Sequence, residues 1–300
     1  MSVLTERPAA AEPEARSAAR KRPRHVKGTR PGWFVYACLG VVMLASVFPF
    51  YWSLLIGSGD SSTIRDPNMS WIPGGNFFAN AAKVINDPAV NFWVALWNSI
   101  VSSGLIALSV VFFSTLAGWA FAKLKFKGSN VLLVFVIATM AVPMQLGVVP
   151  LYILFSDLGW TGQLGAIIVP ALVSAFGVFW MTQYLRQAVP DELIEAARVD
   201  GASSFRTFLT VGLPAARPAA AMLALFTFVS AWNNFFWPFI VLDRQNPTLP
   251  VALSLLQSNY FVDYSIVLAG VLLATVPLLI LFVFAGKQLV SGIMQGAVKG

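Results

Sequence analysis

The chain has 300 residues, of which 57% are hydrophobic and 11% are charged, and its formal net charge is +7. Soluble domains carry about 25% charged residues, so this composition excludes an ordinary soluble protein and predicts an all-α membrane protein. The chain has one histidine and one cysteine, which excludes a zinc cluster and the Ser-His-Asp and Cys-His catalytic arrangements. We therefore expect no metal site and no catalytic residue.

The first thirty residues are rich in Ala, Pro, Arg and Glu. Such a segment cannot bury a core, so residues 1–30 are predicted to form a disordered basic cytoplasmic tail. Its basic run from Arg20 to Arg24 precedes a hydrophobic stretch, where membrane topology and anionic lipid explain the charge better than nucleic acid does. That stretch is longer than the core of a signal peptide, so we interpret it as an uncleaved anchor.

Six stretches without charged residues each offer the roughly 20 apolar residues that a helix needs to cross a bilayer. Six crossings place both termini on one side of the membrane. The predicted spans are Trp33 to Ile56, Phe92 to Ala122, Val131 to Phe155, Leu164 to Tyr184, Ala219 to Leu242, and Tyr264 to Gly286. We expect the first span and an extracytoplasmic loop in 31–90, a core of five helices in 91–287, and a cytoplasmic tail in 288–300.

The distribution of charge predicts the orientation and the source of energy. Seventeen of the 20 lysines and arginines lie on the side of the termini, and only Arg65, Lys83 and Arg244 lie on the other. Cytoplasmic loops retain excess positive charge, so both termini and the loop 186–217 are expected in the cytoplasm.

No charged residue lies well inside a span, whereas ion-driven transporters usually carry such groups there. The chain also lacks a phosphate-binding P-loop, so any ATP must bind another chain.

Two local patterns predict how the spans pack and bend. Small residues at four-residue spacing allow close helix approach, and ordinary bundle packing explains them. The two series are Ser99, Ser103 and Ala107, and Ser114, Gly118 and Ala122. Pro143 and Pro150 in the third span, and Pro238 near the end of the fifth, each remove a backbone donor and favour a kink.

A polar segment separates the fourth and fifth spans. Pro190 and Asp191 predict a helix start, because a carboxylate can cap free backbone N–H groups and complement the helix dipole. The apolar face of this helix comprises Leu193, Ala196 and Ala197. Gly201 follows Asp200 and predicts the helix end, since glycine adopts a left-handed conformation without steric cost.

A second short helix is predicted directly afterwards. Ser203 or Ser204 can cap it, and its apolar residues are Phe205, Phe208 and Leu209. Leu213-Pro214 then leads into the next span. Helices this short are unstable alone in water, so they pack either on their own spans or on a partner protein.

The segment closely resembles the EAA loop of the permease subunits of binding-protein-dependent ABC importers, roughly E-A-A-x-x-D-G-A followed by L-P. The matching residues are Glu195, Ala196, Ala197, Asp200, Gly201, Ala202, Leu213 and Pro214. The resemblance implies a type I ABC importer permease fold in which this loop docks on an ATP-hydrolysing subunit. We expect these residues and Phe205 to couple the chain to that ATPase.

More narrowly, residues 33–300 resemble the second permease of maltose-type carbohydrate importers. This resemblance rests on Asn98-Ser99, Trp232-Asn233-Asn234, Trp237-Pro238, Thr248-Leu249-Pro250 and the terminal Gly296-Ala297-Val298-Lys299-Gly300. One departure is Asn234, where many relatives carry Glu. The resemblance also implies that the last six residues contact the ATPase, namely Gln295, Gly296, Ala297, Val298, Lys299 and Gly300.

The resemblance implies the partners: a related second permease, two ATP-binding cassette subunits, an extracytoplasmic sugar-binding protein and the lipid bilayer of a bacterial cytoplasmic membrane. ATP and magnesium would bind the ATPase, so this chain is expected to bind no cofactor, and no nucleic acid. General likeness to actinobacterial sugar permeases suggests a di- or oligosaccharide, such as the β-glucoside cellobiose. The alternatives are an importer permease for another solute class and a stand-alone secondary transporter.

A sugar site needs aromatic faces and amide groups. The fifth span supplies both, in Trp232, Asn233, Asn234, Phe235 and Trp237. Aromatic residues at this depth also serve in packing or in the interfacial belt, and in maltose-type systems the partner permease holds most of the sugar site. The segment from Leu242 to Asp263 is a stronger expected contact with the binding protein.

Overall fold

The computed structural model describes residues 32–62, 64, 70–258 and 261–297, and for 287–297 it describes the backbone alone. The predicted tail 1–30 and the terminal Val298, Lys299 and Gly300 lie outside the described residues. The chain divides into two units, 1–47 and 48–300. Every regular element in the described residues is helical, in agreement with the all-α prediction.

Helix α1, Trp33–Gly57, has 25 residues and is long and apolar enough to cross a membrane. In the first unit its side chains are mostly exposed, as expected where lipid or another membrane helix covers an apolar surface. In the second unit its last turn is buried. There, a Cβ atom on Gly57 would lie only 3.0 Å from the backbone nitrogen of Ala269.

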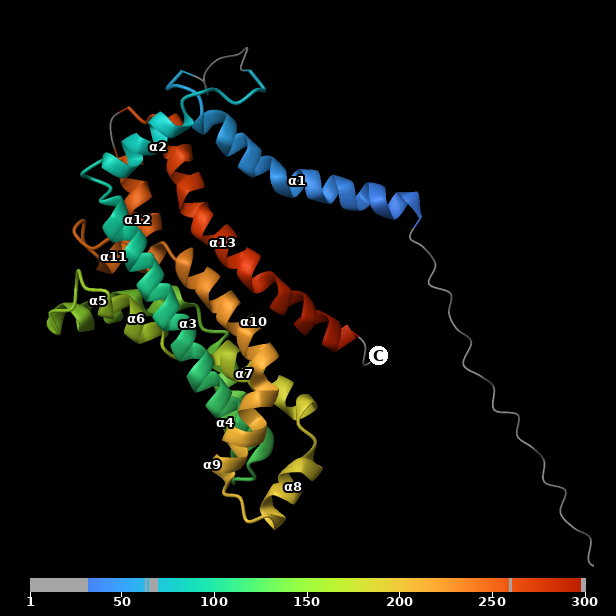
Figure 1. The fold of residues 1–300 in the computed structure, drawn as a ribbon. Helices are drawn as coiled ribbons and strands as arrows, with labels where there is room; N and C mark the ends of the chain where they lie inside the picture. The colour runs from blue at the N-terminus through green and yellow to red at the C-terminus, as the bar shows by residue number, and fades with distance from the viewer. Residues whose placement is uncertain (1–31, 63, 65–69, 259–260, 298–300) are drawn as a thin grey trace, which may run out of the picture. The chain divides into compact units, whose positions relative to one another are not determined.

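Helix α3, Phe92–Lys123, is the central element of the second unit and packs on α7, Ala175–Ala188, and on α10, Leu213–Trp232 (Figure 1). The largest buried cluster joins these three helices and includes Val110, Met181, Leu185 and Leu223. A second cluster joins α3 and α10 to α2, Phe77–Asn86, to α12, Leu249–Ser254, and to α13, Tyr264–Ala297.

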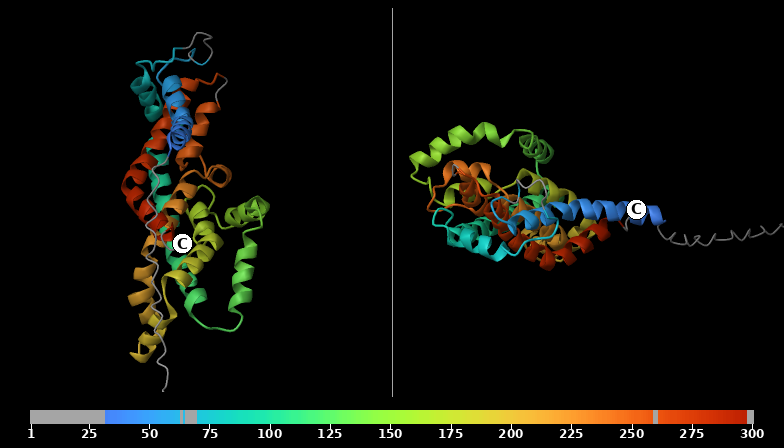
Figure 2. Two further views of the ribbon diagram at one scale, coloured as in Figure 1. Left: turned by 90° about the vertical axis from the view of Figure 1, so that its right-hand side faces the viewer. Right: turned by 90° about the horizontal axis from the view of Figure 1, so that it is seen from above.

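The third span is sharply bent. Helix α4, Ser129–Thr139, is followed by the 3₁₀ helix η2, Met144–Gly147, and by α5, Val148–Asp157, and the two arms differ in direction by 84°. Pro143 causes the break, since it lacks an N–H group and adopts an extended ψ of 128°. Pro150 lies in the first turn of α5, where proline is tolerated, so only the kink at Pro143 is confirmed. Figure 2 shows α4 and α5 at the periphery of the bundle.

The fourth span, Gly165–Ala188, consists of α6, Gly165–Ile168, the 3₁₀ helix η3, Val169–Ala171, and α7. Among the residues that the structure describes, five helices are long and apolar enough to cross a membrane, and the bent pair makes a sixth span if it counts as one. The predicted number therefore agrees with the structure.

The prediction for the fifth span, Ala219 to Leu242, was wrong at its C-terminal end. The helix that contains this span runs from Ser204 to Trp232, because α9, Ser204–Thr207, continues through a π-helical turn, Phe208–Gly212, into α10. Pro214 is the second residue of α10, which directly follows the π-helical turn. Beyond the break at residues 233–235, α11, Phe236–Val241, is separate, so Pro238 does not kink the span.

Glycine and serine allow α3 and α7 to approach closely. A Cβ atom on Gly118 of α3 would lie 2.6 Å from the Cβ of Met181, and one on Gly177 of α7 would lie 2.3 Å from Oγ of Ser114. Such distances are far below van der Waals contact, so only glycine fits at either position. The small-residue series around Ser114 and Gly118 therefore has the packing role that was predicted.

We predict that Gly118→Ala destabilises the protein by about 1 to 3 kcal/mol, because the added methyl group forces α3 and α7 apart. Gly104→Ala on the same helix is the matched control, since its Cβ would have no neighbour within 4 Å. Thermal unfolding of the detergent-solubilised protein measures both. Equal effects of the two substitutions would contradict this account of the α3–α7 contact.

Candidate functional site

The polar segment begins at a fixed junction with α3. Helix α8, Asp191–Val199, starts after Pro190, which is extended and provides no side-chain cap. The predicted capping role of Asp191 was wrong: its carboxylate accepts a hydrogen bond from Lys123 Nζ at 2.7 Å, at the end of α3. This hydrogen bond, with the charge of Lys123, holds the pKa of the Asp191 carboxyl below its usual value. The ion pair thus ties the start of α8 to α3.

Helix α8 packs on its own membrane helices through Ile194, which is its one buried side chain. Ile194 joins the cluster that contains Trp119 of α3 and Leu185 of α7. Of the predicted apolar face, Leu193 and Ala196 are exposed and Ala197 is half-buried. One face of the segment therefore packs on its own spans, whereas another is left exposed by the residues that the structure describes, and docking on a partner stays a prediction.

The helix ends in a Schellman motif. Gly201 has φ of +74°, the left-handed conformation that the sequence predicted. The Gly201 N–H donates to the Arg198 carbonyl at 3.0 Å, and the Ala202 N–H donates to the Ala197 carbonyl at 2.9 Å. The spacing of Ala197, Gly201 and Ala202 in the sequence motif is thus the spacing that this helix end requires.

The second half of the segment continues directly into the membrane. Of the two predicted caps, the structure uses Ser203, whose Oγ accepts a hydrogen bond from the Arg206 N–H at 3.2 Å. The π-helical turn lies against Trp119, because a Cβ atom on Gly212 would lie 2.6 Å from its ring. Trp119 also contacts Phe208, with ring centroids 5.9 Å apart. Residues 204–232 therefore form one continuous rod whose base packs on α3.

The structure brings the predicted coupling residues together on this one segment. Ala197 and Ala202 are half-buried, and the exposed members are Glu195, Ala196, Asp200, Gly201, Phe205, Leu213 and Pro214. Phe205 is 64% exposed, and Val199, which the motif did not single out, is 88% exposed. Exposed apolar side chains often mark interaction sites. Val199 directly precedes Asp200 of the motif, and sequence reasoning missed it as a candidate coupling residue.

The predicted sugar-path residues separate into two groups. Trp232 is buried and stacks on Phe228, and Trp237 is buried and its Nε1 donates to the Ala166 carbonyl at 2.9 Å. Both tryptophans pack within the protein. Asn233, Asn234 and Phe235 are exposed at the break between α10 and α11. Only these three present the amide and aromatic surface that a sugar requires.

A clasp formed by Asn98, Ser99, Pro247 and Leu249 joins α3 to α12. Asn98 Nδ2 donates to the Pro247 carbonyl at 3.1 Å, and the Leu249 N–H donates to Ser99 Oγ at 2.7 Å. Leu249 is the first residue of α12, whose own N-cap Thr248 makes no side-chain cap. Ser99 therefore caps α12 from another helix, because it accepts the hydrogen bond of the first N–H group. The next residue, Pro250, has no N–H group and needs no acceptor. Two sequence patterns about 150 residues apart thus meet in one hydrogen-bonded contact.

The clasp holds only part of the segment from Leu242 to Asp263. Leu249, Val251, Ala252 and Leu253 are buried. Residues 243–246 and Phe261 are exposed. The segment is therefore an anchored helix flanked by exposed ends, rather than an exposed loop throughout.

We predict that Ser99→Ala lowers the free energy of unfolding by about 1 to 3 kcal/mol, because it leaves the buried Leu249 N–H without a partner. Ser102→Ala is the control. Ser102 is equally buried, but its Oγ bonds to the Asn98 carbonyl of its own helix at 2.6 Å, so its loss should cost less than about 1 kcal/mol. Unfolding midpoints in detergent test the pair, and a larger loss for the control would refute the capping role.

Comparison with known proteins identifies the family. Residues 111–290 match the model for binding-protein-dependent transport system inner membrane components. The arabinooligosaccharides transport system permease protein AraQ of Bacillus subtilis is 33% identical over 265 residues, covering 87% of this chain and 93% of that protein. The trehalose/maltose transport system permease protein MalG of Thermococcus litoralis is 30% identical over 268 residues, covering 87% and 95%.

The fold is also similar to a solved structure. A chain of a bacterial ABC transporter involved in the import of the acidic polysaccharide alginate superposes with a TM-score of 0.71 at 22% identity, covering 85% of this chain and 95% of that chain. The chain therefore has the same fold as that transporter chain.

The chain belongs to the binding-protein-dependent transport system inner membrane components. It is a multi-pass inner-membrane permease subunit of an ABC transporter, and it is not itself an ATPase. The resemblance stated from the EAA loop is thereby confirmed. Members of this family bind no cofactor of their own and work with a binding protein.

Proposed function

We propose that this permease imports a di- or oligosaccharide and that the segment 190–214 is its coupling surface for an ATPase. The observation that carries the coupling proposal is the continuity of α9, the π-helical turn and α10. A force applied at Phe205 would act on a rod that extends without interruption to Trp232. The complex would contain a related second permease and two ATP-binding cassette subunits.

The anchors of α8 support the same proposal. Ile194 and the Lys123–Asp191 ion pair attach α8 to α3 and α7, while Val199 and Phe205 remain exposed. A partner that binds the exposed side chains would therefore move α8 and α10 together. Closure of a nucleotide dimer could then bias one state of the gate by several kcal/mol, which full switching requires.

The proposed orientation places both termini and the coupling surface in the cytoplasm. It is supported by the seventeen to three distribution of basic residues. Contact of Gln295 to Gly300 with the ATPase is proposed on the family resemblance alone.

The substrate class is supported by the relatives, whose names refer to arabinooligosaccharides and to trehalose and maltose. We propose Asn233, Asn234 and Phe235 as the sugar-contacting residues of this chain, because they are exposed where α10 breaks. Trp232 and Trp237 would support them from within the core. Among sugars, we propose a β-glucoside, on the general likeness to actinobacterial sugar permeases.

We predict that Gly201→Asp lowers recovery of the ATPase with the tagged permease at least about tenfold, because an unpaired carboxylate would be buried at the contact. Gly159→Asp is the matched control. Gly159 also has positive φ, at +67°, and its Cβ would also have no neighbour within 4 Å. The two variants thus carry the same backbone strain, and only the first lies on the coupling surface.

Val199→Glu gives a second variant at the coupling surface, because its side chain is 88% exposed and its change should not affect folding. Co-purification from membranes that contain the complete importer measures all three variants. Normal ATPase recovery with both Gly201→Asp and Val199→Glu, or uptake by this chain without ATP, would refute the coupling proposal.

The sugar class has its own test. We predict that the binding protein that stimulates the reconstituted importer binds a β-linked disaccharide in calorimetry, and that Asn234→Ala reduces uptake of that sugar at least about fivefold, with ATPase recovery unchanged. Binding of an amino acid or glycerol phosphate instead would refute the sugar class, while an α-linked sugar would refute only the β-glucoside.

A further inference from the structure

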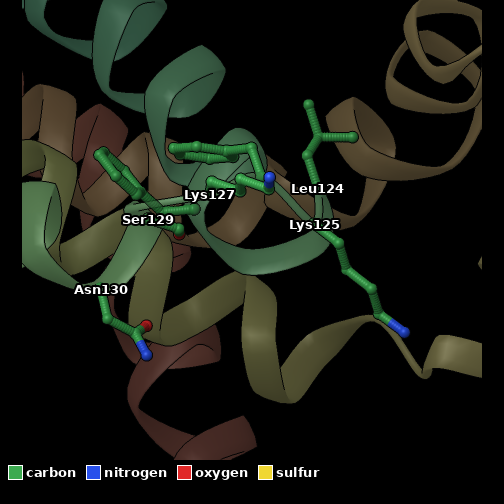
Figure 3. Close-up of a pocket in the computed structure, with 7 residues that line it drawn as sticks. Leu124, Lys125, Lys127, Ser129 and Asn130 are labelled. Atoms are coloured by element: carbon green, nitrogen blue, oxygen red, sulfur yellow. The ribbon is translucent and has the colours of Figure 1, made fainter.

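A hollow beside the coupling segment is not explained by the transport mechanism. It has a volume of about 510 Å³ and is lined by residues 121, 124–127, 129 and 130, in the turn between α3 and α4 (Figure 3). We refer to it as the lysine hollow. Lys123, two residues from Lys125, forms the ion pair with Asp191, so the hollow lies at the same end of the spans as the coupling segment.

The lysine hollow is positively charged and has no acidic lining residue. Lys125 and Lys127 are exposed, and the neighbouring Lys123 is paired with Asp191. Helix α4 begins at this hollow, after Gly128, without a side-chain cap and without an acidic residue in its first turn. The positive end of the helix dipole therefore adds to the lysine charge. Together these features favour an anion.

The hollow also has an apolar side. Phe121 and Phe126 lie against each other with ring centroids 5.9 Å apart, and Leu124 lines the same hollow. In Figure 3 the Lys125 and Asn130 side chains extend on opposite sides of the turn. A free anion in water gains nothing from phenylalanine rings, whereas a lipid brings both a phosphate and apolar chains.

The position of the lysine hollow across the membrane agrees with a lipid as the ligand. One span ends at Lys123, and the first arm of the next begins at Ser129. The turn between them therefore lies where the chain leaves the hydrocarbon layer, at the level of the phospholipid headgroups. Lysine side chains at this level reach the headgroups readily.

We propose that the lysine hollow binds the headgroup of an anionic phospholipid, such as phosphatidylglycerol. Lys127 and the start of α4 contact the phosphate, Lys125 adds positive charge from the other side of the turn, and the rings of Phe121 and Phe126 contact the adjoining glycerol and acyl carbons. Phosphate is the shared chemistry, and the membrane, rather than a soluble phosphate compound, is its source.

The test measures lipid binding to the full-length chain by native mass spectrometry in detergent. The chain is titrated with phosphatidylglycerol, with phosphatidylcholine and with inorganic phosphate. We expect a preference for phosphatidylglycerol that falls at least about fivefold in the double variant Lys125→Gln/Lys127→Gln, because each basic residue near an anionic headgroup contributes to binding. Lys125→Arg/Lys127→Arg should retain the preference.

The double variant Arg186→Gln/Arg217→Gln is the matched control, since it removes two exposed charges from the ends of α7 and α10. An equal loss in this control would overturn the proposal, because the lysines would then act only through net charge. Displacement of the lipid by millimolar inorganic phosphate would overturn the lipid as the source. Unchanged lipid binding with reduced ATPase recovery in the lysine variant would assign the hollow to the protein partner instead.

A second measurement needs no variant and covers the case in which the lysine variant does not insert. A phosphatidylglycerol with a photoreactive headgroup is cross-linked to the wild-type chain in membranes. Cross-links within residues 121–130 support the proposal, and their absence there, with cross-links elsewhere, overturns it.

Discussion

The close packing of α3 against α7 and α10 is the contact on which the rest of this permease depends. Gly118 and Gly177 remove the side-chain volume that would keep α3 and α7 apart. In a membrane, apolar surfaces gain little by leaving lipid, so helix association relies on close van der Waals contact of this kind. The packing creates a rigid support in which Met181, Leu185 and Leu223 are almost inaccessible to solvent.

Each end of α3 then fixes one functional part of the chain. At one end, Lys123 pairs with Asp191, and Trp119 packs against Gly212 and Phe208. At the other end, Asn98 and Ser99 hold the start of α12. Since a buried polar group without a partner costs free energy, the contacts of Asn98 and Ser99 define the position of α12 more strictly than apolar packing alone would. The helix therefore connects the coupling segment to the loop on the opposite side of the spans.

The same arrangement relates the proposed lipid site to the coupling segment. Lys123 ends α3, Lys125 and Lys127 follow it at two-residue spacing, and Lys123 forms the salt bridge with Asp191. Asp191 is also attracted by Lys125. An anion in the lysine hollow would therefore lie close to Lys123 and Asp191, whose ion pair attaches α8 to α3. The binding of that anion does not depend on the transport cycle.

The features that depend on local chemistry could be predicted from the amino-acid sequence. The number of spans follows from long apolar stretches, because the cost of burying charge in lipid acts residue by residue. The end of α8 at Gly201 and the cap at Ser203 are equally local, since each depends on hydrogen bonds within a few residues. The EAA-like motif is itself a continuous pattern, and the family that it indicated is the one that the comparison identifies.

The remaining features required contacts between distant residues. The C-terminal boundary of the fifth span was misplaced because the apolar sequence continues through α11, whereas the helix breaks at residues 233–235. Trp232 and Trp237 have the composition of a sugar site, but their burial against other helices assigns them to the core. Periodicity places a side chain on a face of its helix, and only the neighbouring helices decide whether that face is covered. For that reason the amino acids alone established the class, the number of spans and the EAA-like motif, whereas the folded chain decided which residues of each motif are exposed.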